Sequence, residues 1–491
     1  MAEYMHGAYG QIGSTNTKAT TRSRNAIVYV GTAPVHTVEG GAKNVNRPVV
    51  VNDMSEARKY FGMSYEWEKY TLCEAVHAHF ALNEVGPLIL INVLDPATHK
   101  SSESGTVSLT PENGMVRIVN AGDIMLESVT VESKVKDTDY KITYDPAKGV
   151  ITLAEARVGG LGTEALTITY ESVDVSKVTE NDVIGASDGD GLNTGLFAVK
   201  NVYQLTGYVP SFLLCPGYSG VKDVHAAMIK NSQKINSHWD AYVLADIPIA
   251  DAEGEAVTLS TAKTWKDANG YNCANETVYF PLAKGTDGYT YHLSVLAAAN
   301  LQVLLSQQDG IPYKTASNTG CPIIENLYLG EDSLGRVYDD ELINEKLCKN
   351  GIASAAYVGG SWRIWGAHSA NYVYGTEDRL SEAENNRMML QYISNDFQHR
   401  RSGDVDKPMT ANDIKMLVSE EQSRLDALVK TGALIYGKVV FDGDAKRMGD
   451  IITGKYLFSF EAGTTPLCSS LIADVSWTDA GYQVYFASIA Q

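Results

Sequence analysis

Residues 191–248 read GLNTGLFAVKNVYQLTGYVPSFLLCPGYSGVKDVHAAMIKNSQKINSHWDAYVLADIP, and this stretch decides the fold. Residues 211–215 form a short apolar run that ends at a Pro-Gly break, which is typical of a buried strand. The helix-patterned residues 221–235 follow, and residues 240–246 form a second apolar run. Strand, crossover helix and strand together build a parallel sheet. No phosphate loop, nucleophile motif or metal-ligand cluster lies on this unit, so we expect a scaffold that works through shape and contact.

The composition is that of an ordinary soluble protein with sizeable cores. The chain has 491 residues, of which 44% are hydrophobic and 20% are charged. This length is enough for roughly three domains. The formal net charge of −19 argues against nucleic acid as a main partner, because phosphate binding needs clustered Lys and Arg. The six cysteines form no CxxC pair, which indicates free thiols in a reducing compartment.

The sequence predicts neither a secretory signal nor direct insertion into a membrane. Residues 1–20 contain no apolar core of the kind that a signal peptide needs. The most apolar helical stretch, SVLAAANLQVLLSQ, is 14 residues long and contains Asn300 and Gln302. That length and those polar residues predict a buried core helix. We therefore expect a protein that is made and kept in the cytoplasm unless a larger particle carries it out.

Changes of pattern along the chain predict a multidomain protein of mixed α/β and α+β type. Short alternating runs such as LTITY, at residues 166–170, replace the α/β pattern after residue 96 and indicate an antiparallel β-sandwich. The expected segments are an N-terminal extended arm (1–22), a small α/β domain (23–96), a β-sandwich insertion (97–185), a larger α/β domain (186–355), an α+β C-terminal domain (356–471) and a C-terminal strand arm (472–491).

The C-terminal third shows clear helix and strand signals. Ser381 and Glu384 match a capping box, which predicts a helix over residues 381–399. A second helix is expected from Thr410, with strands at residues 433–441 and 456–461 after it. Residues 472–477 and 482–489 read as two further strand-like pieces, and the edge of the last one must be paired by something.

Catalysis by a hydrolytic triad is the first alternative, because Asp246 ends a strand of an α/β core. Neither a G-x-S-x-G elbow nor a subtilase-type segment occurs in the chain, and Ser317 and Ser361 match neither pattern. We interpret Asp246 as a strand-end residue and expect no enzymatic activity.

Metal binding is the second alternative, and we expect no metal or other cofactor. Cys73 and His77 share a helix face, but His79 points elsewhere and further ligands are missing nearby. The acidic, glycine-rich residues 182–190 lack the spacing of a calcium-binding loop, so we interpret them as an interdomain linker.

Three arginines and the two termini are the candidate contact sites. Arg387, Arg400 and Arg401 could grip an acidic partner, although interleaved acidic residues also fit a solvated helix face with local ion pairs. The N-terminal arm and the C-terminal tail are candidates for strand addition to another subunit, and a tail that folds back on its own domain is the alternative. The candidate interface residues in these arms are Tyr4, Tyr9, Tyr482, Val484 and Phe486.

The order of these parts resembles contractile phage tail sheath proteins. The similarity lies in AIVYVGTAPV, NRPVVVNDMSEARKYFG and LCEAVHAHFALNEVGPLILINVLDP near the N-terminus, and in GLNTGLFAVKNVYQLTGYVPSFLLCPGYSG. It continues in RLSEAENNRMMLQYISNDF, GALIYGKVVFD and the IADVSW tail. It covers nearly the whole chain and is weakest in the β-insertion. Its motifs are diffuse packing patterns and include no invariant catalytic residues.

The resemblance implies a structural subunit of stacked hexameric rings around a tail tube, whose contraction drives the tube through a bacterial envelope. Neighbouring subunits would exchange N- and C-terminal arms, and baseplate and tail terminator proteins would be further partners. Residues 186–355 would be a subtilisin-like domain without a working triad. The C-terminal domain would face the tube, which makes Arg387, Arg400 and Arg401 tube-facing candidates. The competing classes are a divergent subtilisin-like hydrolase and a receptor-binding tail protein.

Overall fold

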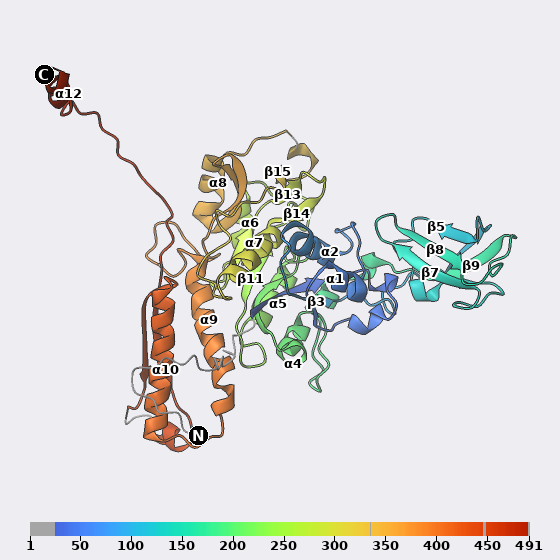
Figure 1. The fold of residues 1–491 in the computed structure, drawn as a ribbon, viewed down its shortest axis with the longest axis horizontal. Coiled ribbons are helices and arrows are strands. Elements are labelled where there is room, and N and C mark those ends of the chain that lie inside the picture. Colours follow the sequence, from blue (N-terminus) through green and yellow to red (C-terminus); the bar gives the residue numbers. More distant parts are fainter. Residues whose placement is uncertain (1–24, 334, 445–447, 490–491) are drawn as a thin grey trace, which may run out of the picture. The chain divides into compact units, whose positions relative to one another are not determined.

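The computed structural model describes residues 25–489 except 334 and 445–447. The described residues divide into two compact units, one that ends at Asp413 and one that begins at Ile414, which we describe separately. Figure 1 shows the course of the chain through both units.

A mixed sheet forms the centre of the first unit. Inner neighbours pair in parallel, whereas the outermost pairs, β16–β17 and β2–β3, are antiparallel. The parallel strands are buried on both faces, which explains their unbroken apolar sequences. In spatial order the eight strands of this sheet, within the described residues, are β17 (Ser361–Trp365), β16 (Ile352–Val358), β12 (Glu276–Tyr279), β11 (Tyr242–Asp246), β10 (Val209–Leu214), β1 (Asn25–Gly31), β3 (Leu88–Asn92) and β2 (Val49–Val51).

The strand–helix–strand unit predicted from residues 191–248 is present. Strands β10 and β11 pair in parallel, and α5 (Lys222–Ser232) connects them and packs on both. The separation of residues 23–96 from residues 186–355 needs correction, because β1, β2 and β3 lie in the same sheet as β10, β11 and β12. This pairing could not be predicted from local sequence patterns, because the insertion separates the two segments. Strands β1 and β10 are neighbours in the sheet but nearly 180 residues apart in sequence.

Helices and a small sheet complete the first unit. The apolar stretch predicted as a core helix is α7 (Leu293–Gln307), which packs on β11 and β12. A small antiparallel sheet consists, among the described residues, of β13 (Leu282–Gly285), β14 (Thr290–His292) and β15 (Ile324–Tyr328). The remaining helices are α1 (Met54–Phe61), α2 (Thr71–Val76), α3 (Glu180–Ile184), α4 (Val202–Thr206), α6 (Ala262–Asn269), α8 (Asp340–Lys346) and α9 (Glu384–Arg401).

The expected capping box at the start of α9 is wrong. Ala383 takes the N-cap position, and the Ser381 hydroxyl donates to the backbone oxygen of Asp378 at 2.9 Å. The Glu384 carboxylate instead accepts a hydrogen bond from the Thr277 hydroxyl of β12 at 2.5 Å. The first residue of α9 is therefore tied to the central sheet, a contact across more than 100 residues that no local pattern indicates.

The residues expected to form a β-insertion fold into antiparallel sheets within the first unit (Figure 1). In the described chain, one three-stranded sheet contains β4 (Gly105–Leu109), β9 (Leu166–Tyr170) and β6 (Thr130–Val131). The other contains β5 (Met115–Ile118), β8 (Val150–Glu155) and β7 (Tyr140–Asp145). Apolar side chains from both sheets, including Val116, Leu153 and Ile168, form one shared core that is separate from the core of the central sheet.

The second unit combines a long helix with a β-hairpin. Helix α10 (Ala411–Lys430) starts just before the boundary of the unit and buries Leu417, Leu425 and Leu428, as its periodicity predicts. Strands β18 (Leu434–Phe441) and β19 (Phe458–Thr464) pair antiparallel, and α11 (Met448–Ile452) lies between them in sequence. The last described element is α12 (Tyr482–Ile489).

Candidate assembly interface

The carboxyl end of β11 carries the acidic side chain that an α/β hydrolase would need. Asp246 is 4% exposed, and its carboxylate accepts hydrogen bonds from the Ser294 backbone N–H at 3.0 Å and the Ser294 hydroxyl at 2.5 Å. Burial raises the pKa of Asp246 against the opposing effects of His292 and Ser294. Because the buried Ser294 hydroxyl donates to a carboxylate, no imidazole takes its proton, and it is not an activated nucleophile. Asp246 instead holds the first turn of α7.

The neighbouring histidine is held in a form that cannot act as a base. His292 Nδ1 lies 2.7 Å from Glu74 Oε2, and the His292 backbone N–H donates to Glu74 Oε1 at 2.5 Å. Burial lowers the pKa of His292, but the Glu74 and Asp246 carboxylates outweigh this effect and raise that pKa to about 9. The imidazole is therefore protonated at neutral pH and cannot accept a proton. The pair joins α2 to the start of α7.

The histidines considered as metal ligands have other partners. His79 is buried and its Nε2 lies 2.8 Å from the Tyr29 hydroxyl, while His77 Nδ1 lies 3.2 Å from the Tyr291 hydroxyl. The Cys73 sulfur accepts a backbone hydrogen bond from Ser64. Burial lowers the pKa of His79 to about 3, so its ring is neutral. Within the described residues, no group of three or more His, Cys, Asp or Glu side chains could hold a metal ion.

The acidic loop at residues 182–190 makes local hydrogen bonds. Asp182 forms a capping box with Thr179 at the start of α3. Asp188 Oδ1 accepts hydrogen bonds from the backbone N–H groups of Asp190 and Leu192 at 2.8 and 3.0 Å. These turns organise the connection into the central sheet.

The arginines of α9 form ion pairs with acidic residues nearby in sequence. Arg400 Nε lies 2.7 Å from Asp396 Oδ2, and Arg401 lies 3.4 Å from Asp404 Oδ2. Arg387 is half-buried on the same helix. Arg400 and Arg401 therefore make the local pairs that the alternative interpretation describes.

The C-terminal tail differs from its predicted form. Residues 466–481 contain no helix or strand, and residues 482–489 form α12 where a strand was expected. No strand within the described residues pairs with this tail, so α12 satisfies its backbone groups by local hydrogen bonds. Its apolar side chains face solvent: Trp477 is 78%, Val484 74% and Phe486 59% exposed. The N-terminal candidates Tyr4 and Tyr9 lie outside the described residues.

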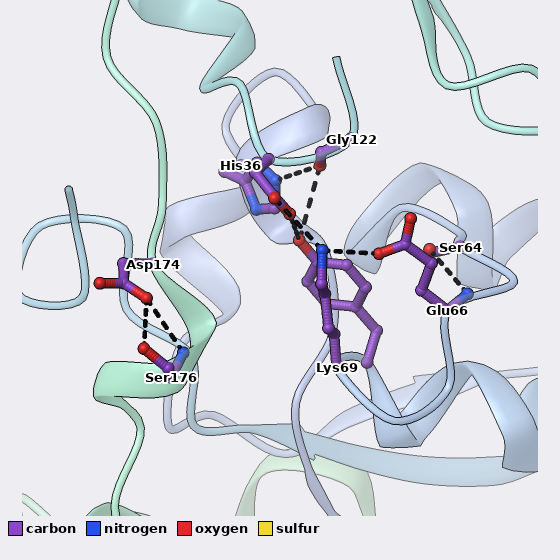
Figure 2. Close-up of polar contacts among 9 residues, drawn as sticks. His36, Ser64, Glu66, Lys69, Gly122, Asp174 and Ser176 are labelled. Atoms are coloured by element: carbon purple, nitrogen blue, oxygen red, sulfur yellow. Dashed lines mark hydrogen bonds and ion pairs between the residues drawn. The ribbon is translucent and has the colours of Figure 1, made fainter. Parts of the chain in front are cut away.

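A polar cluster fixes the β-insertion to the body of the first unit (Figure 2). His36 Nε2 lies 2.8 Å from the Gly122 backbone oxygen, and the Tyr70 hydroxyl donates to Asp123 at 2.9 Å. Lys69 bridges Asp123 and a glutamate of its own loop. Burial lowers the pKa of His36 to about 4, so the ring stays neutral and donates to the carbonyl. No local sequence pattern indicates this contact, because its partners lie more than 50 residues apart.

No helix within the described residues is long and apolar enough to span a membrane. The structure thus presents exposed apolar residues at one end of the chain and a closed polar network at the strand ends of the sheet. The first is typical of an assembly contact and the second of a structural core.

Known proteins with similar sequences share one description. No family model matches the chain. It is 26% identical over 486 residues to the tail sheath protein of Burkholderia phage BcepMu, covering 95% of each chain. It is 23% identical over 340 residues to the major tail sheath protein of Serratia phage KSP20, covering 68% of this chain and 78% of that protein. The tail sheath protein of Escherichia phage P2 is 22% identical over 308 residues, with coverages of 61% and 72%.

Solved structures show the same fold at low sequence identity. The contracted helical sheath of the anti-feeding prophage matches with a TM-score of 0.54 and 13% identity, covering 97% of this chain and all of that one. The contracted PVC sheath complex of an extracellular contractile injection system matches with a TM-score of 0.52 and 13% identity, with coverages of 98% and 99%. The prediction of a mixed α/β multidomain fold is confirmed, and so is that of a structural protein and not an enzyme. The chain is therefore similar in sequence to phage tail sheath proteins, over 95% of its length in the case of the BcepMu protein.

Proposed function

We propose that the chain is the repeating subunit of a contractile sheath, which polymerises as stacked hexameric rings around a tail tube and contracts to drive the tube through a bacterial envelope. The match to a phage tail sheath protein over 95% of both chains carries this proposal. The described residues contribute a rigid central sheet, a compact insertion and an exposed tail, which are the parts that a lattice subunit needs.

Each segment of the chain would have its own structural role. Residues 186–355, together with strands β1, β2 and β3 of the same sheet, would form a subtilisin-like domain without a triad, which fits the closed network around Asp246 and Ser294. The insertion at residues 97–185 would project outward as a β-sandwich. The C-terminal domain would face the tube, with Arg387, Arg400 and Arg401 as candidate contacts.

The termini would connect neighbouring subunits by strand addition. Residues 472–489 carry apolar side chains that no described part of the second unit covers, and their transfer to another subunit would remove them from water. An eight-residue helix is only marginally stable by itself, so the conversion of α12 into a strand costs little. The hairpin β18–β19 is the proposed receiving sheet. Strand addition of this kind keeps subunits joined while they rotate.

The expected partners follow from this role. They are further copies of the chain, the tail tube protein, and baseplate and tail terminator proteins. The net charge of −19 does not favour nucleic acid. The finished location would be the tail of a virion or of a phage-tail-like particle, after assembly in the bacterial cytoplasm. The catalytic alternative is not favoured, because His292 is protonated and Ser294 is buried.

Electron microscopy of the purified chain tests this proposal. We expect striated hollow tubes from the full-length protein and a folded monomer after deletion of residues 482–491. Val484→Asp should also prevent polymerisation, whereas Val158→Asp is the matched control because Val158 is a fully exposed apolar residue of the insertion. Persistent monomers from the intact chain would refute the sheath role, and normal tubes from the truncated chain would refute arm exchange.

A further inference from the structure

A side chain of α10 occupies the outer edge of β18. Gln422 Nε2 donates to the Gly437 backbone oxygen at 3.0 Å, and Gln422 Oε1 accepts from the Val439 N–H at 3.0 Å. In an antiparallel pair, alternate residues point their backbone groups toward the partner strand. The Asp442 N–H donates to the Leu457 oxygen, which identifies the even-numbered residues of β18 as those facing β19. Gly437 and Val439 therefore face the opposite edge.

The Gln422 amide makes the hydrogen bonds that a neighbouring strand would make. In a parallel ladder, a residue donates to the backbone oxygen of the residue before its partner and accepts from the backbone N–H of the residue after its partner. Gly437 and Val439 flank Lys438, so the Gln422 amide takes the place of a residue paired with Lys438. Asp426 Oδ1 also accepts from Gln422 Nε2 at 2.8 Å, which fixes the orientation of the amide. The helix is closely seated, because a Cβ atom at Gly437 would lie 2.8 Å from the Leu425 Cβ.

We propose that Gln422 closes the outer edge of β18 to strand addition by an extended segment of a second copy. This inference rests on the proposed function, since the exchanged arms are the strands that would compete for the edge. A strand that joins here must first displace the amide, which already satisfies the Gly437 oxygen and the Val439 N–H. Unassembled subunits, which expose apolar tails, thus meet a closed edge at β18.

Gln422→Ala tests this inference in the full-length chain, with Ser423→Ala as the matched control. Ser423 is the adjacent exposed residue of α10, and its hydroxyl bonds a backbone oxygen of its own helix. In the dilute monomer, we expect hydrogen exchange at the Val439 amide to become about tenfold faster in Gln422→Ala and to stay unchanged in Ser423→Ala. Sedimentation velocity should then show self-association of Gln422→Ala beginning at about tenfold lower concentration than in wild type.

Gln422→Glu provides a second variant that keeps the acceptor for Val439 but loses the donor to Gly437. Its helix content should match wild type, and its Val439 exchange should lie between those of wild type and Gln422→Ala. Unchanged Val439 exchange in Gln422→Ala would overturn the inference, and so would faster exchange without earlier association. The hydrogen exchange is measured on the monomer. A failure of wild-type chains to form tubes would therefore refute the proposed function without affecting the interpretation of the exchange at Val439.

Discussion

Glu384 should make the stability of the first unit depend on pH in a way that a single substitution removes. The carboxyl is 1% exposed and its described hydrogen bond comes from the neutral Thr277 hydroxyl. Burial raises the pKa of Glu384 to about 7, although the Thr277 hydroxyl lowers it. Because the folded pKa exceeds the unfolded value, the stability that this group contributes is present below the unfolded pKa and lost as pH rises through 7. The rise of the Glu384 pKa from its ordinary value of 4.5 corresponds to about 3 kcal/mol.

Glu384→Gln keeps the shape and the acceptor but cannot ionise. We expect the variant to be more stable than wild type by about 3 kcal/mol at pH 8 and of similar stability at pH 4.5. Urea unfolding followed by tryptophan fluorescence, at a concentration where the chain is monomeric, gives the difference at each pH. A constant difference between the two pH values would show that Glu384 does not titrate in this range and would refute the reasoning.

Two further substitutions test the other buried contacts. Glu74→Gln leaves the His292 imidazolium without its partner and should destabilise the first unit by about 3 kcal/mol at pH 7 in urea unfolding. The pKa of His292 is raised to about 9, so the stability from this pair is complete below pH 6.5 and is lost as pH rises through 9; an equal loss at pH 10 would contradict the assignment. Asp123→Ala removes the partner of Tyr70 and Lys69 and should weaken the attachment of the insertion by about 1 kcal/mol, seen as faster hydrogen exchange around Gly122. Glu164→Ala, at an exposed position of the insertion, is its control, and equal exchange in both variants would contradict the role of the cluster.

The elements that the sequence predicts well are those whose cause is local. The apolar runs at residues 211–215 and 240–246 correspond to strands β10 and β11 because these runs are buried on both faces of the sheet, and the helix between them follows from the need for a crossover. The merging of β1 and β10 into one sheet has no local cause, since an insertion of about ninety residues separates the two segments. Strands this far apart in sequence pair because of how the whole core packs, which local sequence patterns do not indicate.

The mistaken details at the C-terminal end share another cause. Ser381 and Glu384 have the spacing of a capping box, but the Glu384 carboxylate instead accepts a hydrogen bond from Thr277 in the central sheet. Residues 482–489 are rich in aromatic and aliphatic side chains, which is typical of a strand, but a strand needs a sheet edge to join. No strand among the described residues pairs with this segment. Of the candidate site, the exposed tail was thus predictable from sequence, whereas its conformation in the isolated chain was not. Gln422 gave no signal, because its role depends on the strand that packs against its helix.

During a contraction, the buried contacts would keep the first unit rigid, and the exposed tail would change its conformation. Asp246 binds the first turn of α7, Glu74 binds His292 and Glu384 binds Thr277, so the helices of the first unit are tied to its sheet by side chains that are costly to separate. A unit held in this way moves as a rigid body, because a deformation that separates these groups would leave a buried polar side chain without its partner. Residues 466–481 have no regular structure and carry exposed side chains, so they can change direction without breaking a core. We therefore infer that the rearrangement of a sheath built from this subunit is absorbed in the tail, while the central sheet keeps its form.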